Sequence, residues 1–178
     1  MAKRVPFSGQ NLELVEAAQH HNDAEDALGL FFSSVSPSFS IRFAGYRSTE
    51  VLLELNERVA ELDRNTTMNL LAAVEAAFRI DYLQRCYQKK RDKISRQFRE
   101  VYKKKKARAG LEEDIFEVWK NNTIGSAKLI GELRGAFNFR HWMAHGRYWV
   151  PKLGRKYDYI SVYPLALAAF SSFPLITR

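Results

Sequence analysis

The sequence predicts an all-α fold, in the form of a single helical bundle with one long basic helix. Apolar residues recur every three or four positions through most of the chain, the spacing that gathers them on one face of a helix. Residues 65–108 contain neither glycine nor proline, so nothing interrupts a long helix there. No internal repeat or flexible linker divides the chain, and residues 1–178 are therefore expected to form one domain.

Two helices are predicted in the first third of the chain. Residues 10–34 have apolar side chains at helical spacing. Residues 35–47 contain Pro37 and several serines, which favours a loop. A second helix is then expected to run to about residue 63, beginning at Ser48 or Thr49, either of which can cap it.

A long third helix carries most of the positive charge. Asn65-Thr66-Thr67 can cap it, and it can run, straight or kinked, as far as Lys106. Its second half lies in the basic segment, residues 85–108, which holds twelve Lys/Arg residues against two acidic ones. The other 154 residues hold 16 basic and 18 acidic residues, so the whole positive excess is in this segment. Such a segment indicates a polyanion partner such as nucleic acid, or it is a solvated helix face.

The last third is predicted to be helical, with one irregular stretch. Gly110 is expected to end the long helix, and Gly146 suits the C-terminal cap of a later one. The expected elements are a short acidic helix at 111–121, a helix at 124–145, an irregular or briefly extended stretch at 147–163, and a last helix that Pro164 opens and that runs through Phe170.

Composition excludes several classes of protein. Cys86 is the only cysteine, so the chain can form neither an internal disulfide nor a cysteine-based zinc site, and a reducing, cytoplasmic setting is expected. The basic N-terminus lacks the apolar run of a secretory signal. No stretch has the ~20 apolar residues that a membrane-spanning helix needs. We expect a soluble protein with no membrane partner.

The helix predicted at residues 124–145 carries the residues with the clearest chemistry. Arg140 falls on its apolar stripe. Arg147 lies just beyond the expected cap. A neighbouring polar stripe has steps of four, three and four residues and consists of Arg134, Asn138, His141 and His145.

Three interpretations of this cluster are open from residue types alone. Arg140 can be a satisfied, partly buried arginine with surface histidines beside it. His141 and His145 have the i, i+4 spacing of two metal ligands, but Trp142 stands where zinc peptidases have glutamate and no nearby carboxylate offers a third ligand. The third interpretation is metal-independent cleavage of a phosphodiester. Histidine transfers protons near neutral pH, and arginine binds phosphate as a fork.

The string RHWMAHGRYW at residues 140–149 resembles the signature of the HEPN superfamily. That signature is an arginine, four to six residues and a histidine, usually with a polar residue directly after the arginine. Arg140 and His145 fit it, with His141 as the polar follower, whereas Arg134 and His141 have a fitting spacing but lack the follower. The segments FRHWMAHGRYW and AVEAAFRIDYLQR are similar to bacterial HEPN proteins found near toxin and phage-defence systems.

This resemblance covers about residues 65–165 and implies a homodimeric helical bundle. It also implies an endoribonuclease that cleaves RNA without metal or other cofactor, leaving a cyclic phosphate, as a toxin or phage-defence effector. In that interpretation Arg140 contacts the scissile phosphate and His145 is the acid or base. Glu75 resembles a residue that supports the motif, although its position four residues before Arg79 also suits an ordinary helix ion pair. The other supporting candidates are His141, Asn138 and Arg134.

Helix geometry constrains how the motif can work. Positions five apart on a straight helix point about 140° from each other, so Arg140 and His145 do not converge within one chain. Either the helix unwinds near Gly146, or a two-fold axis brings the motifs of two subunits together. The second alternative agrees with the resemblance, and we predict a homodimer.

Two other functions are open. The chain can be a catalytically inactive nucleic-acid-binding module, with Tyr87, Phe98 and Tyr102 either stacking on bases or, as we favour, packing in the core. It can also be a helical module that binds a partner, such as a cognate antitoxin or regulator protein. The candidate RNA-binding residues are Arg147, Lys89, Lys90, Arg96 and Lys103.

Overall fold

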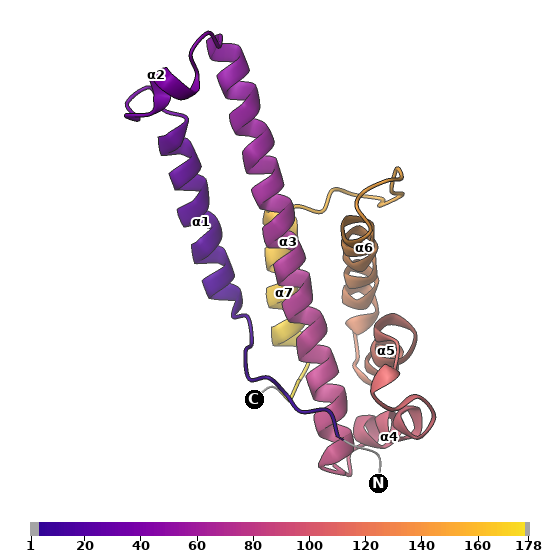
Figure 1. Cartoon of the computed structure of the whole chain (residues 1–178). Helices are drawn as coiled ribbons and strands as arrows, with labels where there is room; N and C mark the ends of the chain where they lie inside the picture. The colour runs from indigo at the N-terminus through magenta and orange to yellow at the C-terminus, as the bar shows by residue number, and fades with distance from the viewer. Residues whose placement is uncertain (1–3, 177–178) are drawn as a thin grey trace.

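The all-α fold is confirmed by a computed structural model, which describes residues 4–176. No β-strand forms within that range, and none of its helices has the length and apolarity that a membrane crossing requires. The elements in chain order are α1 (Leu14–Phe31), α2 (Phe39–Arg42), α3 (Ser48–Tyr87), α4 (Lys93–Lys105), the 3₁₀ turn η1 (Lys106–Arg108), the π-helical turn η2 (Leu111–Ile115), α5 (Phe116–Asn122), α6 (Ser126–Ala144) and α7 (Tyr159–Ser172) (Figure 1).

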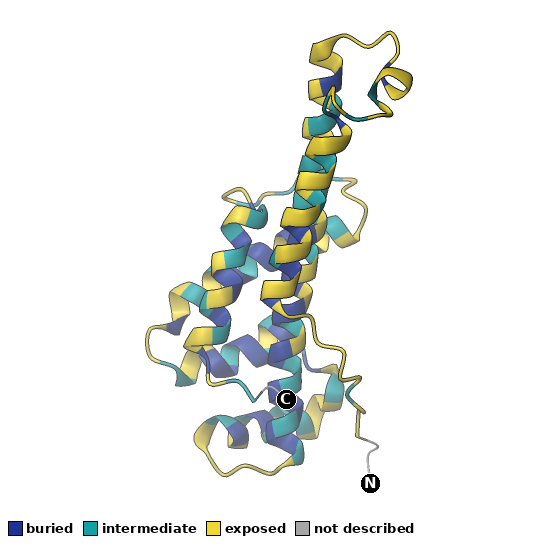
Figure 2. Ribbon diagram, turned by 90° about the vertical axis from the view of Figure 1, so that its left-hand side faces the viewer, coloured by how far each residue is buried: buried dark blue, intermediate teal, exposed yellow. Residues whose placement is uncertain are grey.

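α3 is the axis of the molecule. It has 40 residues, which corresponds to a length of about 60 Å. Helices α1, α4, α6 and α7 all pack against it (Figure 1). Its second half supplies much of the core, where Leu70, Leu71, Val74 and Phe78 are fully buried. Its first half and α1 form an arm that projects from the body and is mostly exposed (Figure 2).

The predicted helix boundary at Asn65 is wrong, because α3 continues across it without a break. Thr66 and Thr67 are buried inside the helix. The Thr66 hydroxyl lies 3.0 Å from Nδ1 of His21, a buried residue of α1. The hydroxyl thus joins two packed helices instead of capping a new one, and no glycine or proline interrupts the segment.

The predicted end of the long helix at Lys106 is also wrong, since α3 stops earlier and the chain turns back into α4. Asp92 caps α4, and its carboxylate accepts a hydrogen bond from the Ser95 amide at 3.0 Å. The reversal lets Phe98 pack on Tyr82, with ring centroids 5.3 Å apart. A straight helix would leave this apolar seam in water, and the core packing expected of Phe98 is confirmed by its complete burial.

The last helix begins before Pro164, so the prediction that this proline opens it is wrong. Asp158 and Ser161 form a reciprocal cap, in which each side-chain oxygen accepts a hydrogen bond from the other residue's amide at 3.0 Å. Pro164 deprives the Ile160 carbonyl of its helical donor, but Ile160 is 77% exposed and its carbonyl can bind water. The cap therefore decides where α7 starts.

A buried arginine ties the C-terminal tail to the end of α3. The Nε of Arg85 donates to Asp81 at 2.7 Å, and its Nη2 donates to the Pro174 carbonyl at 2.8 Å. Its Nη1 lies 3.2 Å from Asp92, the cap of α4. Burial raises the pKa of Asp81 above its usual value, although the Ile176 amide and the Arg85 guanidinium oppose that rise. One guanidinium thus joins α3, α4 and the tail.

We expect the substitution Arg85→Ala to lower the free energy of unfolding by roughly 3–5 kcal/mol, because the Asp81 carboxylate is left buried without its counter-charge. Chemical denaturation followed by circular dichroism measures the loss. Adding Asp81→Asn removes the stranded charge and is expected to restore part of the stability. Lys104→Ala, on an exposed position of α4, is the control and should change stability by less than about 0.5 kcal/mol. A loss for Arg85→Ala as small as that of the control would contradict this account.

Candidate active site

α6 carries the motif and runs antiparallel to α3 (Figure 1). It begins after Gly125, whose φ of 78° lies in the left-handed region that glycine adopts readily. Its buried face packs into the core through Ile130, Leu133, Ala136 and Phe137. The bounds predicted for this helix, 124 and 145, agree with the structure to within two residues.

A Schellman motif closes α6 at the predicted glycine cap. The Gly146 amide donates to the Met143 carbonyl, and the Arg147 amide donates to the Trp142 carbonyl, each at 3.1 Å. Gly146 has a φ of 76°, which suits glycine, and its predicted role as the cap is confirmed. α6 ends at Ala144 and His145 is its cap, but the His145 amide still donates to the His141 carbonyl at 3.1 Å. The chain leaves the helix at Gly146, only after both motif residues.

Arg140 is held on α3 by a carboxylate that two arginines share. Its Nη1 lies 2.9 Å from Oε2 of Glu75, and the other oxygen of Glu75 accepts a hydrogen bond from Arg79 at 2.7 Å. Arg79 also donates to the Ala109 carbonyl at 3.0 Å. One carboxylate between two guanidiniums leaves a net positive charge, and 33% of the Arg140 side chain is still exposed. The guanidinium is therefore oriented and remains open to an anion.

The two histidines of the motif lie together at the end of α6. The ring centroids of His141 and His145 are 4.3 Å apart, and the Trp149 ring lies 5.9 Å and 6.3 Å from them. Both histidines are exposed. Within residues 4–176, no hydrogen bond or ion pair joins His145 to Arg140. The structure thus brings His141 and His145 together and leaves Arg140 apart from them, on a different face of the helix.

The rest of the predicted polar stripe divides into two parts. Asn138 is exposed on the surface of α6. Arg134 donates to Glu117 at 2.6 Å and to the Glu112 carbonyl at 2.8 Å, which ties α6 to α5 and η2. Arg134 therefore joins α6 to its neighbouring elements and does not lie at the motif, although the helical spacing predicted one continuous polar stripe from Arg134 to His145.

Arg147 turns back toward the arm. Its Nη1 donates to Oε2 of Glu61 on α3 at 2.7 Å, and the same oxygen accepts a hydrogen bond from Arg64 at 2.6 Å. The Arg147 guanidinium holds the pKa of the Glu61 carboxyl below its usual value. Arg147 is thus fixed beside α3, with 39% of its side chain exposed.

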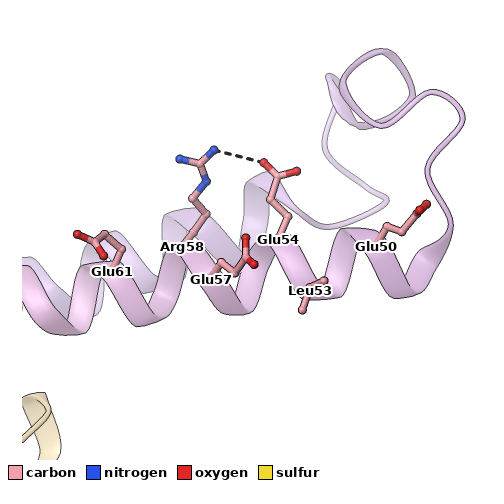
Figure 3. Close-up of a pocket in the computed structure, with 6 residues that line it drawn as sticks. All are labelled: Glu50, Leu53, Glu54, Glu57, Arg58 and Glu61. Atoms are coloured by element: carbon pink, nitrogen blue, oxygen red, sulfur yellow. Dashed lines mark hydrogen bonds and ion pairs between the residues drawn. The ribbon is translucent and has the colours of Figure 1, made fainter. Parts of the chain in front are cut away.

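An acidic groove on the arm borders this contact. It is open, and it runs along the first half of α3, with Glu61 at its inner end (Figure 3). The residues that line it are Glu50, Leu53, Glu54, Glu57, Arg58 and Glu61. Arg58 is the single cation in this lining, and it lies 3.4 Å from Glu54. Glu54 also pairs with Arg42, and Glu61 pairs with Arg64 and Arg147, so the negative charge left without an ion pair within residues 4–176 is that of Glu50 and Glu57. The arm therefore does not extend the cationic surface of the motif.

The part of the basic segment that holds Lys89, Lys90 and α4 lies at the other end of the body from the motif (Figure 1). α6 leads away from that end over 19 residues, about 28 Å. The last residue of the segment, Arg108, precedes Ala109, whose carbonyl accepts a hydrogen bond from Arg79 beside Glu75. Arg96 donates to a carbonyl in the turn between α3 and α4, and Lys103 pairs with Glu100 at 2.7 Å. The side chains of Lys89 and Lys90 are exposed and have no partner in the described chain. The predicted RNA-binding residues therefore form no continuous surface with Arg147 within one chain.

The histidine pair lacks the donors of a metal centre. Across residues 4–176 there is no group of three or more His, Cys, Asp or Glu side chains placed to hold a metal ion. His141 and His145 supply two ligands, whereas catalytic zinc sites in proteins have three. The nearest charged groups of α6 are arginines, which disfavour a cation. These residues do not fit a metal-dependent site.

Comparison with protein-family models, with curated proteins and with solved structures gives no match for this chain. The resemblance to the HEPN superfamily therefore rests on the motif segments of the sequence alone.

Two contacts that shape the site have no signal in the sequence. Glu61 lies 86 positions before Arg147, and the pair forms only because the arm and the end of α6 meet. The Trp142 indole donates to the Trp149 carbonyl at 2.7 Å and holds the loop after the motif. No spacing in the sequence predicts either of these two contacts, because both form only through the turn that follows Gly146.

A double-mutant cycle tests whether Glu75 fixes Arg140. We expect Glu75→Gln and Arg140→Gln to show a coupling energy of about 1 kcal/mol in chemical denaturation, since the pair is half-buried and partly screened by water. The coupling should decrease at high salt. The exposed pair Glu100 and Lys103 is the matched control, and its coupling should be clearly weaker because water and salt screen it. Equal couplings for both pairs would show that Glu75 does not hold Arg140.

Proposed function

We propose that the chain is a metal-independent endoribonuclease of the HEPN type, with Arg140 and His145 in its active site, acting as a toxin or phage-defence effector. One observation carries the proposal. Arg140 occupies an otherwise apolar face of α6, where Glu75 orients its guanidinium and a third of the side chain stays exposed. The exposed imidazole of His145 follows it in the chain at the spacing of the motif. A guanidinium and an imidazole are the groups that phosphodiester cleavage without metal requires.

In the proposed reaction, the 2′-oxygen of the substrate ribose attacks the adjacent phosphorus. A base takes the 2′-hydroxyl proton, and the 5′-oxygen of the next nucleotide leaves with a proton supplied by an acid. The products are a 2′,3′-cyclic phosphate and a 5′-hydroxyl, so no water and no redox partner is consumed. His145 serves as acid or base, and Arg140 neutralises the charge that develops on the phosphorane oxygens.

The proposed site is shared between two subunits. His145 is the C-terminal cap of α6, and its amide still donates to the His141 carbonyl at 3.1 Å, so positions 140 and 145 keep helical directions about 140° apart. Arg140 and His145 of one chain therefore do not converge on one phosphate. A two-fold axis near the end of α6 would place Arg140 of one subunit opposite the same motif of its partner. A homodimer thus reconciles the motif with the helix geometry.

Incubation of labelled RNA with the protein in excess chelator tests the proposal. Wild type should cut, and Arg140→Ala or His145→Ala should each lower the rate roughly 10²–10⁴-fold, because a phosphate ligand or a proton-transfer group is lost. His20→Ala, which removes an exposed histidine of α1, should leave the rate unchanged. Circular dichroism checks that the variants fold. Unaltered cleavage by both motif variants would refute the assignment.

A non-catalytic nucleic-acid-binding module is the second candidate, and the position of the basic segment favours it. The exposed lysines Lys89 and Lys90 lie at the end of the body away from the motif, where they can bind RNA independently of Arg140. This function requires binding that weakens steeply with salt and produces no cleavage. The chelator assay separates the two candidates.

A further inference from the structure

Four aromatic or imidazole rings gather at the end of α6 and on the loop that follows it. Besides the contacts of Trp149 with His141 and His145, the Tyr148 ring meets the Trp149 ring edge to face, with centroids 4.6 Å apart. Tyr148 is 82% exposed, and both histidines are exposed as well. The cluster therefore presents π-faces to solvent directly beside the proposed acid or base.

The loop that carries Tyr148 and Trp149 is held to the end of α6 by its backbone turn and by one side-chain hydrogen bond. Arg147 has a φ of 60° after the left-handed Gly146, so two successive residues turn the chain sharply over the end of the helix. The hydrogen bond from the Trp142 indole to the Trp149 carbonyl then anchors the loop. Trp142 itself packs on buried Phe139, with centroids 5.7 Å apart. A side chain on such a loop loses little conformational freedom when a ligand stacks on it.

The charge around the cluster favours an anionic ligand over an apolar protein surface. Residues 140–157 contain five basic residues and no Asp or Glu. Four of the five pair with carboxylates elsewhere in the chain, and the carboxylates that bind Arg140 and Arg147 are each shared with a second arginine: the pairs are Arg140–Glu75, Arg147–Glu61, Arg155–Glu132 and Lys156–Asp158. Arg147 and Lys152 flank the Tyr148–Trp149 pair in the sequence, and the Lys152 side chain has no ion-pair partner within residues 4–176. Exposed aromatic rings between cations are typical of surfaces that bind single-stranded nucleic acid, where bases stack on the rings and cations bind the phosphates.

We propose that Tyr148, Trp149 and His141 form a subsite that stacks an unpaired base of single-stranded RNA next to the proposed scissile phosphate. The subsite rests on the proposed function, because it binds the nucleotide neighbouring the one that Arg140 and His145 act on. The subsite implies that the substrate is single-stranded RNA, because a base held within a duplex cannot stack on a side chain.

Fluorescence anisotropy with a labelled 2′-O-methyl oligouridine tests the subsite on the intact protein. This probe has bases and phosphates, but it lacks the 2′-hydroxyl and cannot be cut. Tyr148→Ala should weaken its binding roughly 5- to 150-fold, the cost of losing one stacked base, and Tyr148→Phe should retain most of the affinity. Tyr46→Ala, which removes an exposed tyrosine at the tip of the arm, is the matched control and should bind as wild type does.

Competition by inorganic polyphosphate separates stacking from charge, because polyphosphate has no bases. Its affinity should be the same for wild type and Tyr148→Ala. An unchanged oligouridine affinity in Tyr148→Ala, or equal weakening of both ligands, would overturn the subsite. A fall in molecular mass by light scattering in Tyr148→Ala would instead assign Tyr148 to a contact between copies, which also overturns it. Unaltered cleavage in both Arg140→Ala and His145→Ala, beside base-dependent binding by Tyr148, would refute the proposed active site and leave the base-stacking contact standing.

Discussion

The proposed site depends on one contact, the ion pair between Arg140 of α6 and Glu75 of α3. It fixes the guanidinium on the face of α6 that meets α3 and leaves the imidazole of His145 on another face. The Nε of Arg140 is buried and has no hydrogen-bond partner in the described chain, a cost that an apolar residue would not have. A charge kept at such a cost on a packing surface suits a residue that acts on a ligand.

The elongated shape separates charge along the molecule. The arm carries the acidic groove of α3, and α4 and the turn before it, which hold most of the basic segment, lie at the opposite end of the body. Between them, the end of α6 presents Arg140 and the cationic loop after Gly146. Glu61 joins the arm to this loop through Arg147, so the acidic surface adjoins the motif on one side. We expect a bound polyanion to approach the motif from the side away from the arm.

Local signals in the sequence predicted the features that local structure decides. The helical spacing predicted the all-α fold, Gly146 predicted the end of α6, and the spacing of Glu75 from Arg79 predicted their ion pair. Tertiary contacts decided the rest. Thr66 bonds to another helix instead of capping one, and Phe98 finds its place in the core only because the long helix turns back. The partners of Arg134 and Arg147 lie on other elements, which no local pattern predicts.

Subunit complementation tests most directly whether two chains share one site. Arg140→Ala and His145→Ala proteins, each inactive alone, are mixed, allowed to exchange subunits and assayed for RNA cleavage. If Arg140 of one subunit acts with His145 of its partner, each mixed dimer holds one intact site, and about a quarter of the wild-type activity should return. A mixture as inactive as its components, with exchange confirmed by differently tagged subunits, would contradict the shared site.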